Sequence, residues 1–204
     1  MSSYTSTEPR QRLIAAAERL FADKGIDGVS LAEVTRAAGL GNTGAVHHYF
    51  GGRQELLDAV VDQHREDLDA RREQLFDEAE VLGDTSVDLL VRVLVEPMVA
   101  KLDDERGRAF LAIQAERALR PRPRRGERRP LVLRLFRMLG LPDVPGPTFD
   151  LLMEMGHDLA YVALAKRARE EAGGGRDVGV GRDEFAHQLT RAVTRVNLPD
   201  RDPR

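Results

Sequence analysis

The chain has 204 residues, no cysteine and a formal net charge of −3. This length allows one large domain or two small ones. The absence of cysteine excludes a disulfide framework, a thiolate nucleophile and a cysteine metal site. The slightly acidic charge argues against a protein that coats nucleic acid non-specifically. No run approaches the ~18 consecutive apolar residues of a membrane span, and the N-terminus MSSYTSTEPR lacks the regions of a signal peptide. We therefore expect a cytoplasmic protein that does not associate with membranes.

A first helix is predicted to begin near Thr7-Glu8-Pro9 and to end at Gly25. Proline is favoured in the first helical turn, and glycine is favoured directly after the last one. Five apolar residues at helical spacing should form its buried face. They are Leu13, Ile14, Ala17, Leu20 and Phe21.

The stretch SLAEVTRAAGLGNTGAVHHYF, residues 30–50, predicts two short helices joined by a tight turn. Ser30 is a helix N-cap, Glu33 completes a capping box, and Gly39 ends the helix. Asn42 or Thr43 can cap the second helix. Its inward face would be Ala45, Val46, Tyr49 and Phe50, while Thr43, Gly44, His47 and His48 point outward. A plain αα-hairpin fits this pattern, but so does a helix-turn-helix, which places such a short helix in the DNA major groove.

The wider pattern resembles the tetracycline-repressor-like (TetR) family of bacterial transcription regulators. The resemblance covers roughly Arg12 to Val61, and it is carried by LF…KG, SLAEV, AAG and HYF taken together. The sequence departs from the family pattern in three ways. The turn over residues 40–43 is one residue longer than usual, His47 occupies a position usually held by tyrosine, and Gly51-Gly52 replaces residues that favour helix.

Candidate DNA contacts follow partly from chemistry and partly from the resemblance. The helix N-termini at Ser30 and at Thr43-Gly44 offer backbone N–H groups to phosphates. Gly44 and Ala45 permit close approach to the groove, where the methyl of Ala45 could touch a thymine methyl. The resemblance implies phosphate contacts for three residues, and His48 with Thr43 is our best candidate for reading base edges. The full candidate set is Ser30, Asn42, Thr43, Gly44, Ala45, His47, His48, Tyr49 and Arg53, of which His47, Tyr49 and Arg53 are the three phosphate contacts.

A long helix is predicted from Arg53 to Val81 or Leu82, with one apolar face and with its acidic residues in solvent. Further helices are predicted over 87–102 with a kink at Pro97, over 107–119, over 131–140, over 149–173 with Thr148 as its cap, and over 182–198. Residues 117–137 carry nine arginines against the single acid Glu127. We interpret this segment as an exposed loop, although a second nucleic-acid contact is conceivable.

Together these elements predict an all-α fold. Residues 1–55 would form a weakly basic three-helix head that binds DNA, and residues 56–204 an acidic helical body. We find no catalytic, phosphate-loop or metal motif, and expect neither a cofactor nor enzymatic activity. The isolated histidines at 64, 157 and 187 are interpreted as core or interface residues.

The resemblance implies a repressor that leaves a near-palindromic operator in double-stranded DNA when a small-molecule effector binds the body. It also implies a homodimer paired through the two last long helices. Six residues could line a mainly apolar effector pocket: Met98, Phe110, Gln114, Met153, His157 and Tyr161. The alternative is a helical enzyme, or an adaptor that contacts other proteins, with a head that no longer binds DNA.

Overall fold

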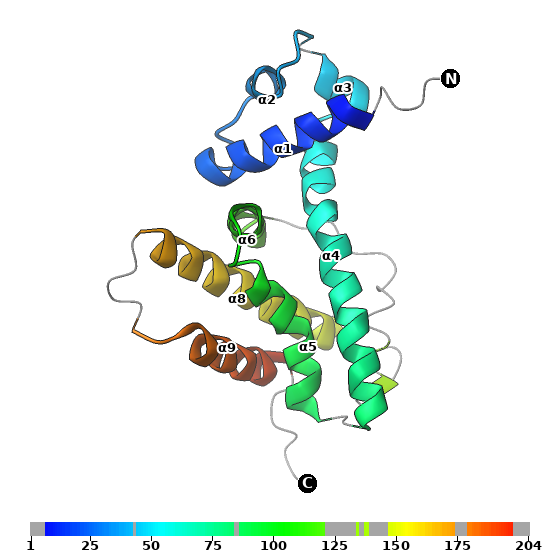
Figure 1. Ribbon diagram of the computed structural model, residues 1–204, viewed down its shortest axis with the longest axis vertical. Helices are drawn as coiled ribbons and strands as arrows, with labels where there is room; N and C mark the ends of the chain where they lie inside the picture. Colours follow the sequence, from blue (N-terminus) through cyan, green and yellow to red (C-terminus); the bar gives the residue numbers. More distant parts are fainter. Residues whose placement is uncertain are drawn as a thin grey trace.

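The computed structural model describes residues 7–42, 44–83, 86–120, 134, 137–138, 147–173 and 179–197. These residues form eight α-helices and no strand, so the predicted all-α fold is confirmed. Three helices form the head at the top of Figure 1: α1 (Thr7–Lys24), α2 (Leu31–Ala37) and α3 (Ala45–Phe50). The body contains α5 (Val87–Ala100), α6 (Glu105–Ala118), α8 (Pro147–Ala172) and α9 (Arg182–Asn197). Between them α4 (Arg53–Leu82) descends from the head along the whole body (Figure 1).

The core of the head continues into the body. All five residues of the predicted α1 face are buried, and they belong to one cluster of buried side chains that extends to Leu189 and Val193 of α9. The predicted boundary at residue 55 falls in the first turns of α4, which therefore contributes to both parts. Because the core is shared, a movement in the body can be transmitted to the head through packed side chains.

The long helix α4 has the predicted bounds, and it ends before Gly83. Its apolar face is buried as predicted, with the exception of Leu82, which is 78% exposed at the end of the helix. The acidic residues of α4 are mostly exposed, as predicted, but some of them share a partner that the sequence did not show. Arg134, half-buried above the ring of Phe76, forms ion pairs with Glu73, Asp77 and Glu80 of α4. One arginine of the basic segment thus neutralises part of this face.

Helix α6 starts two residues before the predicted position because the Asp104 carboxylate caps it, accepting a hydrogen bond from the Gly107 N–H at 2.7 Å. Phe110 and Gln114 of α6 are buried as predicted. Pro97 lies inside α5, also as predicted. α6 runs between α1 on one side and α8 on the other (Figure 1).

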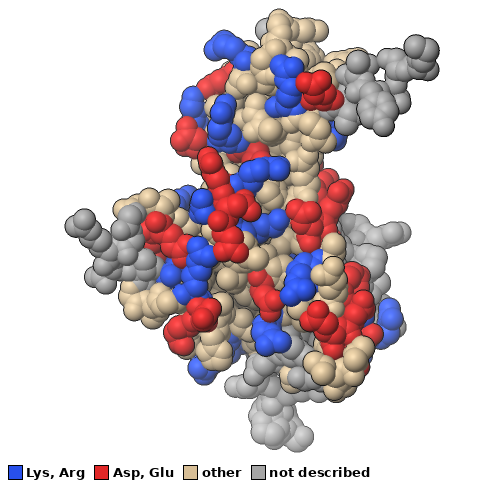
Figure 2. All heavy atoms as spheres, in the orientation of Figure 1, with Lys and Arg blue, Asp and Glu red and all other residues tan. Residues whose placement is uncertain are grey.

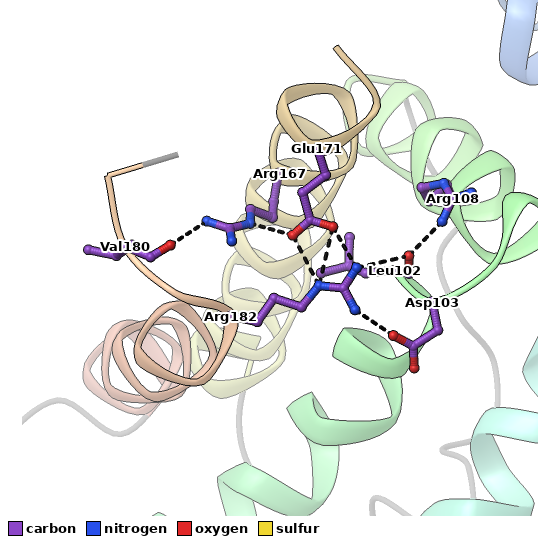
Figure 3. A network of polar contacts seen from close by, with 7 residues as sticks. All are labelled: Leu102, Asp103, Arg108, Arg167, Glu171, Val180 and Arg182. Carbon is purple, nitrogen blue, oxygen red and sulfur yellow. Dashed lines mark hydrogen bonds and ion pairs between the residues drawn. The ribbon is translucent and has the colours of Figure 1, made fainter. Parts of the chain in front are cut away.

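Helices α8 and α9 pack closely where α8 contains a glycine. A Cβ atom on Gly156 would lie 1.9 Å from Oδ1 of the buried Asn197, so only glycine allows this approach. At the other end of the pair, a polar network holds α8, α9 and the turn between α5 and α6 together (Figure 3). In it Arg182 donates hydrogen bonds to Glu171 at 2.6 Å and to Asp103 at 2.5 Å, and Arg167 donates to Glu171 at 2.7 Å.

The predicted helix over 131–140 lies outside the described residues except at 134, 137 and 138, which are helical. The proline- and arginine-rich stretch 121–133 also lies outside them. Among the helices that the structure describes, none is long and apolar enough to cross a membrane.

Candidate DNA-binding site

Hydrogen bonds cap both ends of α2, and those at its C-terminal end form the first half of the turn to α3. The Ser30 Oγ accepts from the Glu33 N–H at 3.1 Å, as the predicted cap requires. Gly39 has a φ of 68° and donates to the Arg36 carbonyl, while the Leu40 N–H reaches back to Thr35. This pair of bonds is a Schellman motif, which requires a left-handed residue at the glycine position.

Two side chains of α1 hold α2: Arg12 contacts the turn after it, and Lys24 contacts its first turn. Arg12 donates through Nε to the carbonyl oxygen of Ala38 at 2.8 Å and through Nη2 to that of Gly39 at 2.8 Å. Lys24 forms an ion pair with Glu33, and together with the backbone N–H of Ser30 it holds the pKa of the Glu33 carboxyl below its usual value. Sequence reasoning missed Arg12, because its partners lie 26 and 27 residues away.

The second half of the turn differs from the prediction. Gly44, rather than Asn42 or Thr43, is the residue that precedes the first turn of α3. The Asn42 side chain accepts from the Gly44 N–H at 2.9 Å, and its carbonyl accepts from the Ala45 N–H at 3.0 Å. Asn42 therefore closes a local turn just before the helix. The candidate Thr43 lies outside the described residues.

Helix α3 turns two histidines outward, as predicted. His47 and His48 are both exposed, and Gly44 before them is half-buried. The Nδ1 atom of His47 lies 2.9 Å from the carbonyl oxygen of Gly51. Since a carbonyl only accepts, Nδ1 must carry the proton and Nε2 is the nitrogen available to a ligand. The ring of His48 contacts that of Tyr49 edge-on, at 4.9 Å between centroids.

Two of the candidate DNA contacts, Ala45 and Tyr49, face the interior of the head instead. Ala45 is 6% exposed in the core cluster, so its methyl is not available to a thymine and we remove it from the interface. Tyr49 is half-buried against the same cluster beside Phe50, in agreement with its predicted place on the inward face of the helix. A phosphate contact by its hydroxyl stays a prediction.

Arg53 has a partner inside the head. Its Nη1 donates to the carbonyl oxygen of Ile26 at 2.7 Å, and its side chain is half-buried. The remaining guanidinium nitrogens leave room for a phosphate contact, which stays a prediction.

The electrostatic prediction for the head also needs correction. Residues 1–55 hold six Lys/Arg and six Asp/Glu, so the head is neutral rather than weakly basic. Figure 2 shows the two signs interspersed over head and body on the face drawn. Arg12, Lys24 and Arg53 are committed to contacts within the head.

Arg36 is a further candidate that sequence reasoning did not select. It is exposed on α2, and within the described part of the head it forms no ion pair. It lies two residues from the buried Val34 and two from the buried Ala38, on the opposite face of the helix. That spacing was a usable signal for an outward-facing cation.

The six residues of the predicted effector pocket are only partly brought together. Phe110 and Tyr161 are buried with ring centroids 5.7 Å apart, and His157 packs edge-on against Tyr161 at 4.5 Å. Met98 and Gln114 are buried in the same core region. Met153 instead contacts a separate small cluster formed by Leu75, Phe76 and Val93.

Two cavities open elsewhere on the molecule. One of about 920 Å³ lies between α5 and α9, with Val95, Val99 and Ala186 in its floor and Arg191 and Arg195 at its rim. A smaller one of about 570 Å³ lies between α1, α3 and α4. None of the six predicted pocket residues lines either cavity.

A capped helix, a left-handed glycine turn and a short second helix with exposed polar residues define a helix-turn-helix protein. Residues 13–60 match the family model described as "Bacterial regulatory proteins, tetR family". This match confirms the predicted resemblance of the head to the tetR family.

The curated relatives match only part of this chain. The transcriptional regulator TtgR of Pseudomonas putida is 36% identical over 78 residues, which cover 37% of this chain and 37% of TtgR. The regulator BetI of Rhizobium meliloti is 38% identical over 52 residues, 26% of this chain and 25% of BetI. The matched part therefore spans little more than a third of these relatives.

Among solved structures, a TetR-family regulator from Streptomyces coelicolor aligns with 97% of this chain and 98% of its own, at 20% identity and a TM-score of 0.47.

Proposed function

We propose that this protein is a transcription regulator that binds a specific site in double-stranded DNA. The observation that carries the proposal is α3, which presents His47 and His48 to solvent on a turn that Arg12 fixes to α1. A rigid short helix with exposed polar side chains can enter a major groove and donate to base edges and phosphates. The regulators similar to the head support this reading. A protein with this proposed function would act in the cytoplasm, where the DNA of a bacterial cell lies.

The proposed functional unit is a homodimer on a near-palindromic operator. One short recognition helix reads only a few base pairs, too few for a typical specific affinity of ~10⁻⁸ M or tighter. Two-fold symmetry doubles the contacts and imposes the same symmetry on the operator.

An exposed apolar face on α8 supports the dimer. Leu151, Met155, Leu159 and Val162 recur at helical spacing and are 38–55% exposed. Leu189 and Val193 of α9, by contrast, are buried within the protomer. We therefore assign the apolar part of the interface to α8, and only polar contacts to α9.

A small-molecule effector completes the proposal, with repression relieved when it binds. The contiguous rings of Phe110, Tyr161 and His157, with Gln114 nearby in the core, offer an apolar environment with few polar groups. An effector that releases DNA must bind the DNA-free conformation more tightly, and DNA must weaken effector binding by the same factor.

Selection from a pool of random duplexes at roughly 0.15 M salt tests the proposal. We expect one enriched motif with two related half-sites in inverted orientation. His48→Ala should lose enrichment at particular base pairs while it retains its fold. A pool without enriched sequence after repeated rounds would contradict the proposed function.

A further inference from the structure

The last turn of α6, in the body, contacts the backbone of the head through Glu116. Both carboxylate oxygens of Glu116 accept from the Ile26 N–H, at 2.9 and 3.1 Å. Ile26 lies in the loop between α1 and α2, and its side chain is buried. On the other side, Arg53 of α4 donates to the carbonyl oxygen of this residue at 2.7 Å. The backbone of Ile26 is therefore held by the body and by the start of α4 at once.

Neighbouring charges orient Glu116. Arg120 donates to the Glu116 carboxylate at 2.8 Å and to Asp27, the next residue of the loop, at 2.6 Å. Arg117 pairs with Asp58 of α4 at 3.3 Å. Exposed ion pairs such as Arg120–Asp27 are weak individually. A carboxylate bound to a backbone N–H is stronger and directional, so Glu116 is the member that fixes a position.

A second contact between head and body joins earlier residues of α1 and α6. Glu18 of α1 is buried and bonded to His64 of α4 and, at 2.9 Å, to Arg106 of α6. Burial would raise the pKa of the Glu18 carboxyl, but the hydrogen bonds from His64 and Arg106 outweigh it, and the net shift is downward. Arg106 and Glu116 are ten residues apart, about 15 Å along a helix. Two polar attachments at that distance, added to the shared packed core, fix the orientation of the head more tightly than the core and the Glu18 attachment do without Glu116.

We propose that Glu116 is a positioning residue that sets the orientation of the DNA-binding head on the body, and thereby the separation of the two half-sites that the dimer accepts. This inference rests on the proposed function, because a separation exists only for a dimer that reads DNA. Glu116 acts through Ile26 and touches no base or phosphate itself. The recognised half-site sequence depends on the residues that contact bases and is independent of the latch, by which we mean Glu116 with its contacts to Ile26 and Arg120.

A purely structural role for Glu116 makes a different prediction. If the carboxylate only stabilised the fold, its loss would lower the melting temperature and weaken binding to all operators alike. A positioning role changes the set of separations that are bound. The separation of half-sites is thus the measurement that distinguishes the two roles.

The experiment repeats the selection from random duplexes with the full chain carrying Glu116→Ala, and compares half-site sequences and separations with wild type. We expect wild type to select a single separation, because two rigidly oriented heads match one helical phase of DNA. Glu116→Ala should select the same half-site sequence at two or more neighbouring separations. Glu116→Gln keeps an oxygen for the Ile26 N–H and should return to one separation. Glu105→Ala, which removes an exposed acid from the same helix, should also select one.

Each outcome of the selection supports or overturns the proposed role of Glu116. A single unchanged separation in a folded Glu116→Ala protein would overturn the latch and leave the proposed function intact. An absence of any motif with wild type would overturn both. If Glu116→Ala does not fold at the selection temperature, Arg120→Ala replaces it, because it removes the guanidinium that orients Glu116 and should broaden the separations in the same direction. An unbroadened Arg120→Ala would then overturn the latch.

Discussion

His47 donates through Nδ1 to the carbonyl oxygen of Gly51, so the neutral ring offers only a lone pair on Nε2. A phosphate oxygen is an acceptor and gains nothing from that lone pair. The protonated ring carries a second N–H, which can donate a charge-assisted hydrogen bond. The hydrogen bond to Gly51 thus makes the charged form of His47 the one suited to a phosphate, whereas tyrosine, usual at this position, donates without a charge.

His47→Tyr should therefore keep operator affinity, because a phenol still donates a hydrogen bond to a phosphate. His47→Ala removes the donor and should weaken binding to operator and random duplexes alike, because a phosphate contact carries no sequence information. Affinities measured at fixed ionic strength check this. An operator affinity that His47→Ala leaves unchanged would remove His47 from the phosphate.

At the residue scale, local rules predicted the parts of the site that depend on neighbours in sequence. The Ser30 cap, the Gly39 turn and the outward histidines all follow from a few adjacent residues. The partner of Arg53 could not be predicted, because Ile26 lies 27 residues away and offers only a backbone carbonyl. The burial of Ala45 also follows from this local pattern, which puts it on the inward face, so only its contact with a thymine methyl was wrong. The start of α3 depends on the Asn42 turn, and a shift of one residue rotates a helix face by about 100°.

At the scale of elements, the helical period predicted most of the helices. It worked for α4 and α9 because their buried residues recur every three or four positions. It could not show which polar side chains meet across elements. The side chains of Glu73 and Asp77 are exposed as predicted, but their partner Arg134 could not be predicted because it is 57 or more residues away.

The apolar face of α8 leads to a prediction about assembly. Met155→Glu places a charge in the middle of this face, where Met155 is 50% exposed in the protomer. Burying an unpaired carboxylate in the interface is costly, so we expect a monomer with unchanged helix content at micromolar concentration. Sedimentation and light scattering measure this. Specific operator affinity should fall with the dimer, while binding to random DNA by each subunit persists.

Val180→Glu is the matched control for assembly. Val180 is also about half exposed, but it lies outside the α8 face. Its replacement should leave the dimer intact. A dimer that survives Met155→Glu would move the interface away from this face of α8.

The network in Figure 3 leads to a prediction about acid stability. Hydrogen bonds from Arg182, and after them from Arg167, lower the pKa of the Glu171 carboxyl to about 2, against the opposing effect of burial. Its usual value is 4.5. A carboxyl with a lowered pKa in the folded state stabilises the fold above pH 4.5, and this contribution is lost as pH falls from 4.5 towards 2.

Glu171→Gln should therefore lower the free energy of unfolding at pH 7 by about 1 to 2 kcal/mol, a figure reduced for solvent screening at the exposed Arg182. Urea unfolding at pH 7 and near pH 2.5 measures the difference between variant and wild type, which should shrink at the lower pH. Glu170→Gln is the control, since Glu170 pairs only at 3.8 Å with an exposed lysine. An equal difference at both pH values would show that the Glu171 charge is not what stabilises the fold.

At the scale of the whole molecule, charge sets how the protein finds DNA. The net charge of −3 and the neutral head leave few cations to attract a polyanion. Non-specific affinity is mainly electrostatic and decreases with salt in proportion to the number of phosphates neutralised. We therefore expect weak binding to random duplexes at physiological salt, with specificity carried by α3 rather than by general attraction.

Two arginines of the head should then differ in a measurable way. Arg36 is exposed and forms no ion pair in the described part of the head, whereas Arg53 is half-buried and holds the Ile26 carbonyl. If Arg36 neutralises one phosphate, Arg36→Gln should reduce the slope of log affinity against log salt by about 0.9 per subunit, equally for operator and random duplexes. It should leave the melting temperature unchanged, because surface substitutions that remove no contact cost little stability.

Arg53→Gln should lower the melting temperature as well as the salt slope, because it removes both a possible phosphate contact and the hydrogen bond that ties α4 to the loop after α1. Filter binding over a range of salt concentrations and thermal unfolding of the same two preparations separate the effects. A slope that Arg36→Gln leaves unchanged would place Arg36 away from the DNA. A melting temperature unaffected by Arg53→Gln would mean that the Ile26 carbonyl gains little from the guanidinium, and that the latch acts through Glu116 alone.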